Sequence, residues 1–83
     1  MSCSVRFEGR ALVQLNGLPS VAFDAIVERV TDLVKEPWDA VIMPPGDDPA
    51  YRITVFGSGL GLLSFHVDDT AEAIRIFDIT WIG

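Results

Sequence analysis

The 83-residue sequence contains a single cysteine and a single histidine, and it has fewer basic than acidic side chains. One thiol, Cys3, cannot form an internal disulfide or supply a pair of metal ligands. Small secreted domains usually depend on disulfides for their stability, so the lone cysteine favours a reducing compartment. We therefore expect a cytoplasmic protein, and we expect neither a bound metal nor a cofactor.

Basic side chains are scarce, since six Lys and Arg stand against twelve Asp and Glu, for a net charge of −6. Binding to a nucleic-acid backbone depends on cationic side chains, so general nucleic-acid binding is not expected. The sequence also lacks an apolar run near the ~20 residues that a membrane-spanning helix needs, and it shows no signal peptide. No membrane association is expected.

Apolar residues, in contrast, are abundant. They make up 49% of the chain and include five Phe, two Trp and one Tyr. The length suits one domain over residues 1–83, and a domain of this size buries only a modest share of its surface. These residues therefore either pack one dense core or leave an apolar patch for a partner.

The first half of the chain is expected to form one strand and two helices. Residues 4–8 alternate polar and apolar side chains, which predicts a short edge strand. A short helix is expected over residues 10–15. After Pro19, apolar residues recur three and four positions apart, which indicates a long amphipathic helix that ends before Pro37. Residues 37–50 contain four prolines and are expected to form an irregular loop.

The second half is expected to form an antiparallel meander of three strands over residues 51–56, 60–68 and 73–81. The fold class that follows is α+β: a small antiparallel sheet of about four strands with a two-helix hairpin packed on one face. The expected core residues are Phe23, Ile26, Val30, Leu33, Ile53, Leu63, Phe65, Val67 and Ile76.

Turn lengths predict which side chains share a face of the sheet. A three-residue turn over 57–59 would pair Phe56 with Leu60, and a turn over 69–72 would close the next hairpin. The face toward the helices would then carry Tyr51, Ile53, Val55, Leu63, Phe65, Val67, Ile74 and Ile76. The opposite face, called the open face below, would carry Arg52, Thr54, Leu62, Ser64, His66, Arg75 and Phe77.

Arg52, His66 and Arg75 form the candidate catalytic site on this predicted open face. Two guanidinium groups on a concave sheet would grip a phosphate, and the imidazole would serve as a general acid or base. The alternative is that all three are ordinary solvent-facing residues of a half-exposed sheet. No carboxylate is spaced to orient His66 as in a catalytic triad.

Three other features have a structural and a functional interpretation. The glycine-rich stretch at residues 57–61 precedes a strand, not a helix, so it predicts a hairpin turn rather than a phosphate loop. Asp68 and Asp69 are typical turn residues, and no further metal ligands stand at a suitable spacing. Trp81 either closes one end of the core or forms a docking surface for a partner or a second copy.

The order of these elements resembles the RelE/ParE superfamily of type II toxin–antitoxin toxins. Residues 10–19, which end in Leu-Pro, resemble the first-helix segment of that family. Residues 36–39 resemble the proline-containing break after its second helix. Residues 51–53, 63–69 and 74–79 resemble its meander. The resemblance covers nearly the whole chain and depends on the order of the motifs.

The resemblance implies a bacterial, toxin-like protein whose partner is a cognate antitoxin. RelE-like members cleave mRNA in the ribosome, and ParE-like members inhibit DNA gyrase. An active enzyme of this kind would be a ribosome-dependent endoribonuclease, and Arg52 matches the first arginine that the family places on the second strand. The alternative is a RelE/ParE-like protein-binding module without catalysis, or a homodimer formed through the apolar C-terminal end.

Overall fold

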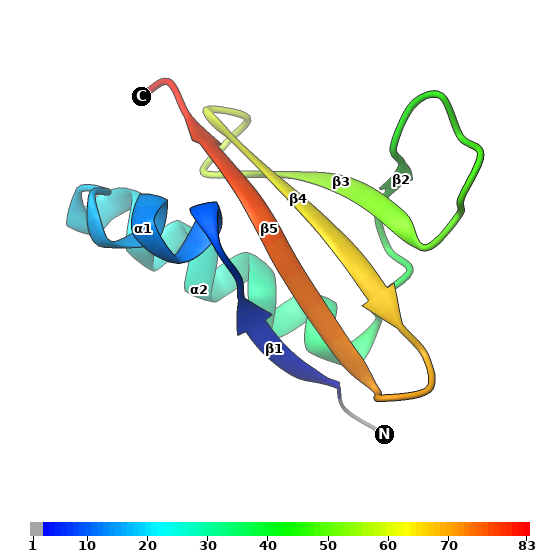
Figure 1. The fold of residues 1–83 in the computed structure, drawn as a ribbon. Coiled ribbons are helices and arrows are strands. Elements are labelled where there is room, and N and C mark those ends of the chain that lie inside the picture. The colour runs from blue at the N-terminus through cyan, green and yellow to red at the C-terminus, as the bar shows by residue number, and fades with distance from the viewer. Residues whose placement is uncertain (1–2) are drawn as a thin grey trace.

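The computed structural model describes residues 3–83 and contains two helices and five strands, which form one sheet in the order β1-β5-β4-β3-β2 (Figure 1). The elements are β1 (Ser4–Phe7), α1 (Arg10–Asn16), α2 (Ser20–Lys35), β2 (Val41–Ile42), β3 (Tyr51–Phe56), β4 (Gly61–Asp68) and β5 (Ala73–Trp81).

The α+β class is confirmed, while the sheet differs in two details from the expected antiparallel one. It is mixed, because β1 pairs with β5 in parallel. It also has a fifth strand, because Val41 and Ile42 of the proline-rich segment pair with β3. This strand is only two residues long, since prolines lie on either side of it, and a proline donates no ladder hydrogen bond.

The two helices cover one face and one edge of the sheet (Figure 1). Helix α2 follows Pro19, its N-cap residue, and buries Ala22, Ile26 and Leu33. Helix α1 lies beside β5, where the Gln14 side chain accepts a hydrogen bond from the backbone N–H of Ile79 at 2.8 Å. Within residues 3–83, neither helix is long and apolar enough to cross a membrane.

Most of the expected core is buried. Ile26, Leu33, Leu63, Phe65, Val67 and Ile76 are at most 3% exposed, and Val30 is partly buried against them. Phe23 was predicted wrongly, since its side chain is 43% exposed. Successive residues of a helix point about 100° apart, and here Ala22 takes the position that faces the sheet. Ile53, also expected in the core, lies on the open face and is partly exposed.

The hairpin between β4 and β5 has the predicted register. Val67 pairs with Ile74, and residues 69–72 form the connecting turn. A β-bulge follows between Ser64 and Phe65. Because one extra residue of β5 is accommodated there, the alternation of side chains in β5 changes after Ile76.

The hairpin between β3 and β4 has a different register from the predicted one. Phe56 pairs with Gly61 rather than with Leu60, so the turn has four residues. Leu60 belongs to this turn, and its N–H donates to the Gly57 carbonyl at 3.2 Å. The observed pairing suits the side chains, because a β-carbon at residue 61 would overlap the Phe56 ring.

This shift by one residue exchanges the two faces of β3, because side chains alternate along a strand. Arg52 and Thr54 face the helices with Phe56, whereas Tyr51, Ile53 and Val55 lie on the open face. Polar side chains therefore lie at the core side of this strand, and apolar side chains lie in solvent.

Candidate functional site

The open face is the surface that was predicted to carry the site. No helix covers it within residues 3–83 (Figure 1). Its side chains come from four strands and alternate with the buried ones. They are Arg6, Tyr51, Ile53, Val55, Leu62, Ser64, His66, Arg75 and Phe77.

Three aromatic rings meet on this face, where β3 begins and β4 approaches its end. Tyr51 lies directly across the β3–β4 ladder from His66, and their ring centroids are 4.7 Å apart in an edge-on arrangement. Phe77 approaches Tyr51 from β5 with a centroid distance of 5.9 Å. Tyr51 is 40% exposed, so its ring and hydroxyl are accessible. Exposed rings of this kind can stack on unpaired nucleic-acid bases.

Arg75 lies beside His66 across the β4–β5 ladder, as predicted. Its Nη2 contacts Asp68 Oδ2 at 3.0 Å, while Nε lies 3.9 Å from Glu8 Oε2, which is too long for a hydrogen bond. Nε is buried and has no acceptor within the described residues. Arg6 of β1 occupies the neighbouring register position, so two guanidinium groups and two carboxylates share this end of the face.

The Asp68 carboxylate is stabilised in its charged form. The backbone N–H of Ala71 donates to Oδ1, and this bond, together with the charges of Arg75 and His66, lowers the pKa of Asp68 below its ordinary value of 3.8. A lowered pKa means that the carboxylate stabilises the fold above the ordinary value and that this contribution is lost as the pH falls through the native pKa. The contact with Arg75 thus persists at neutral pH.

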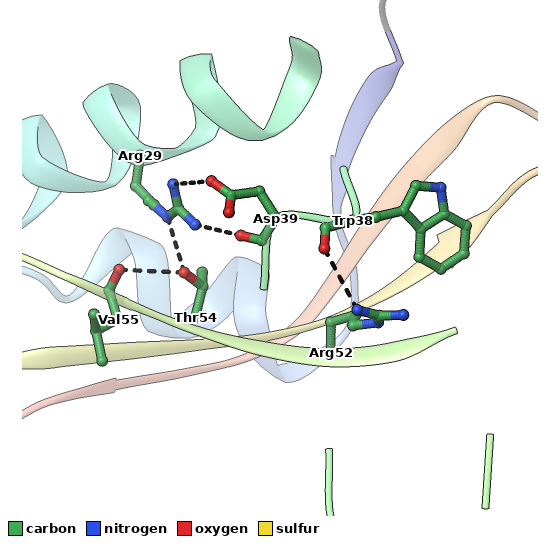
Figure 2. Close-up of polar contacts among 6 residues, drawn as sticks. All are labelled: Arg29, Trp38, Asp39, Arg52, Thr54 and Val55. Atoms are coloured by element: carbon green, nitrogen blue, oxygen red, sulfur yellow. Dashed lines mark hydrogen bonds and ion pairs between the residues drawn. The ribbon is translucent and has the colours of Figure 1, made fainter. Parts of the chain in front are cut away.

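Arg52, the third predicted site residue, is not part of this group. Its side chain lies on the helix side of β3, where Nε donates to the Pro49 carbonyl and Nη1 donates to the Ala40 carbonyl at 3.0 Å. Nη1 also donates to the Trp38 carbonyl (Figure 2). Its guanidinium also lies 5.0 Å from the centre of the Trp38 ring. Arg52 therefore fastens the proline-rich segment to the sheet, and the prediction that it shares the open face with His66 was wrong.

Arg29 of α2 makes a second set of contacts with the same segment (Figure 2). Its Nε donates to Thr54 Oγ1 at 2.8 Å, Nη2 donates to the Asp39 carbonyl, and Nη1 lies 3.7 Å from the Asp39 carboxylate. Thr54 is the one buried polar residue found within 3–83. Arg29 thus supplies the hydrogen bond that a buried hydroxyl on the core side of the sheet requires.

The structure therefore brings together two of the three predicted site residues, His66 and Arg75, and adds Tyr51 to them. Tyr51 was assigned to the face toward the helices because the predicted three-residue turn over 57–59 placed it there together with Ile53 and Val55. The glycine at position 61 was the available signal, since an aromatic residue opposite a glycine favours the register found here. A catalytic role for Arg52, His66 and Arg75 stays a prediction.

The remaining features have structural roles. Trp81 packs against the core and stacks on Phe56, with ring centroids 5.7 Å apart, so it closes that end of the core. Residues 57–59 all have positive φ, as a tight turn requires. Over residues 3–83, no group of three His, Cys, Asp or Glu side chains is placed to hold a metal ion.

Comparison with known proteins identifies the fold. No protein-family model matches this sequence, and no curated protein sequence matches it. Solved structures do match: this two-helix, five-strand arrangement is the fold of RelE toxins.

The match extends over almost the whole chain, as three of these structures illustrate. The isolated RelE toxin of E. coli superposes with a TM-score of 0.84 at 16% identity, covering 99% of this chain and 86% of its own. The E. coli RelBE toxin–antitoxin complex gives 0.82 at 16% identity, with 99% of each chain covered. The RelBE2 toxin–antitoxin complex of Mycobacterium tuberculosis gives 0.80 at 24% identity, with 98% and 99% covered. At these identities, the likeness establishes the fold.

Proposed function

We propose that this chain is the toxin of a toxin–antitoxin pair and that it acts on RNA through its open face. The observation that carries the proposal is the contact of Tyr51 with His66 beside Arg75, on the uncovered face of a RelE-type sheet. The rings would hold an unpaired base, and Arg75 with Arg6 would hold the adjacent phosphate.

The chemistry of such a site is RNA cleavage by the ribose 2′-hydroxyl. His66 would take the proton of this hydroxyl while its oxygen attacks the neighbouring phosphorus. The bond from phosphorus to the 5′ oxygen then breaks, which leaves a 2′,3′-cyclic phosphate and a 5′-hydroxyl that takes its proton from water. His66 is the only histidine of the chain, so no second imidazole supplies that proton.

A cognate antitoxin is the partner in this proposal, in line with the toxin–antitoxin complexes among the similar structures. A cytoplasmic location belongs to the same proposal, because translated mRNA is found there. Arg52 holds the proline-rich segment next to β3 through hydrogen bonds to backbone carbonyls, which supports an indirect role for it in this proposal.

The alternative is a RelE-like binding module without catalysis. Two observations favour it: Asp68 and Glu8 offset the charge of Arg75, and the face carries the exposed apolar side chains of Val55 and Leu62. A phosphate would have to compete with both carboxylates, whereas a protein surface would not. A further form of this alternative is a homodimer formed through the C-terminal end. Ile82, which is 76% exposed, would then lie in the contact between the two copies.

Growth of a bacterial host on induced expression tests the proposal. The wild type is compared with His66→Gln and Tyr51→Leu, and Val55→Ala serves as a control that is exposed on the same face. Loss of a general acid or base typically costs 10²–10⁴-fold in rate, so His66→Gln should abolish growth arrest. Val55→Ala should arrest growth like the wild type. Circular dichroism confirms that each variant is folded.

Mapping of RNA ends in the arrested cells tests the reaction itself. The proposal requires new 5′-hydroxyl ends within translated mRNA for the wild type and their loss for His66→Gln. Arrest by both proteins would exclude His66 as the catalytic group. No arrest by either folded protein would favour the binding module.

A further inference from the structure

A second surface lies at the other side of the molecule, between α2 and the tip of the β3–β4 hairpin. It is a groove of about 700 Å³ with an apolar floor and an acidic wall. Val21, Phe56, Leu60 and Trp81 supply the apolar side chains. Val21 is 65% exposed and Leu60 is 44% exposed, so part of this apolar surface is in contact with solvent.

The acidic wall consists of Asp24, Glu28 and Asp32, which follow one another every four residues along α2. Residues four apart lie on the same side of a helix, and like charges at this spacing destabilise it. All three side chains are exposed, and none is in an ion pair within the described part of the chain. The row therefore costs the isolated protein stability that a cationic partner would restore.

The one cation at this groove is not available to offset the row. Arg29 lines the groove, but its guanidinium is bound to Asp39 and Thr54. The field in the groove is therefore negative, and it repels RNA and other polyanions. This separates the groove from the open face, where arginine and carboxylate side chains are balanced.

A second copy of this chain is a poor match for the groove. Among residues 3–83, Arg10, Arg29 and Arg75 are in ion pairs, and Arg52 is bonded to carbonyl oxygens. That leaves Arg6 and Lys35 of the six basic residues, and these lie on different elements. Self-association would not place a row of cations against the acidic wall.

We propose that this groove docks an amphipathic helix of the antitoxin that is apolar on one side and carries lysine or arginine every four residues beside it. The inference rests on the proposed function in assigning this helix to the antitoxin. From Asp24 to Asp32 the wall is about 12 Å long, or slightly more than two helical turns. Cations with the same spacing on an antiparallel helix would face all three carboxylates, while leucine-type side chains cover Trp81 and Leu60.

A synthetic peptide tests this chemistry directly. The probe is a capped helical peptide of roughly 18 residues, with leucines three and four apart on one side and lysines every four residues beside them. A matched peptide carries glutamate at the lysine positions. Binding is measured by intrinsic tryptophan fluorescence, to which Trp81 in the groove contributes, and by calorimetry, against the wild type and an Asp24→Asn, Glu28→Gln, Asp32→Asn triple variant.

The lysine peptide should bind the wild type, and the triple variant should bind it about tenfold more weakly, as expected for three exposed ion pairs. The glutamate peptide should not bind. A control with Asp69→Asn and Glu72→Gln, two exposed acids of the β4–β5 turn, should bind like the wild type. Equal binding of both peptides, or no effect of the triple variant, would overturn the inference.

Two other outcomes, a dimer formed through the groove and a failure of the proposed toxin function, can be distinguished by experiment. Sedimentation that shows a dimer, dissociated by Leu60→Ser and not by the triple variant, would assign the groove to a second copy and overturn the proposal. Because peptide binding is measured without toxicity, it does not depend on the growth assay. Peptide binding with no growth arrest would support the docking role of the groove and contradict the toxin function. Growth arrest without peptide binding would support the toxin function and contradict the docking role of the groove.

Discussion

At the scale of single residues, the contacts around Arg29 show why a polar side chain can lie on the core side of a strand. Thr54 is 8% exposed, and Arg29 of α2 donates a hydrogen bond to its hydroxyl. Arg29 also reaches the proline-rich segment at Asp39, so one guanidinium joins a helix, a strand and a loop. The side chain of Arg29 is 21% exposed, which makes these bonds more valuable than those of a surface arginine.

Arg29→Met should lower the free energy of unfolding by about 1–3 kcal/mol, because it leaves a buried hydroxyl and a carbonyl without their donor. Arg10→Met is the matched control. Arg10 also pairs with a carboxylate, that of Asp78 at 3.6 Å, but its side chain is 74% exposed, so its loss should cost roughly 0–1 kcal/mol. Urea denaturation measures both. Equal losses of unfolding free energy in the two variants would show that the burial of Arg29 does not make its contacts more stabilising than those of Arg10.

At the scale of elements, the tip of the β3–β4 hairpin joins turn geometry to core packing. Gly57 and Gly59 both have positive φ, of 61° and 87°, in the same turn. A β-carbon at position 57 would lie 2.8 Å from the Trp81 ring, whereas one at position 59 would meet nothing within 4 Å. The two glycines thus differ in their surroundings more than in their role in the turn.

Gly57→Ala should therefore destabilise the protein more than Gly59→Ala, by roughly 1–3 kcal/mol, because the added methyl group displaces Trp81. Backbone strain alone gives the opposite order, since a φ of 61° is near the left-handed minimum that other residues tolerate and 87° is not. Thermal unfolding followed by circular dichroism measures the difference. A larger loss at Gly59 would mean that Trp81 moves aside easily.

The same hairpin shows what the sequence could and could not predict. The helices and the β4–β5 pairing followed from apolar spacing and from the polar turn at 69–72, which are local signals. The β3–β4 register depended on whether Leu60 belongs to the turn or to the strand, and a one-residue error exchanges the faces. The apolar residues of β3 pointed to the wrong answer, because they lie on the face that the fold leaves uncovered. That error put Arg52 and Thr54 on the predicted open face, and so put Arg52 in the predicted site.

At the scale of the whole molecule, the charge of −6 is spread over a body of only 33 × 28 × 23 Å. At 10 mM salt the screening length is about 30 Å, so all twelve carboxylates repel one another. The few ion pairs are mostly exposed and contribute little. Repulsion between these carboxylates should therefore lower the free energy of unfolding of the isolated protein.

Raising sodium chloride from about 10 to 200 mM should increase the free energy of unfolding, by an amount on the order of 0.5 kcal/mol, because salt screens this repulsion. The Asp24→Asn, Glu28→Gln, Asp32→Asn variant has a net charge of −3 (−6 + 3), so it should be more stable at low salt and respond less. Urea denaturation at both salt concentrations measures this. A fall in stability with salt would mean that ion pairs outweigh the repulsion.

The position of β5 between β1 and β4 affects how the protein can fold while it is being synthesised. β5 follows every other element in the chain order, yet it is the strand that lies between β1 and β4 in the sheet. While a ribosome is still making residues 73–81, the core lacks Ile74, Ile76 and Ile79 and cannot close. Folding therefore waits for synthesis to pass residue 81 and depends on distant pairings, which form slowly. A cell that makes this protein thus has an interval in which a partner can meet the unfinished chain before the open face has been assembled.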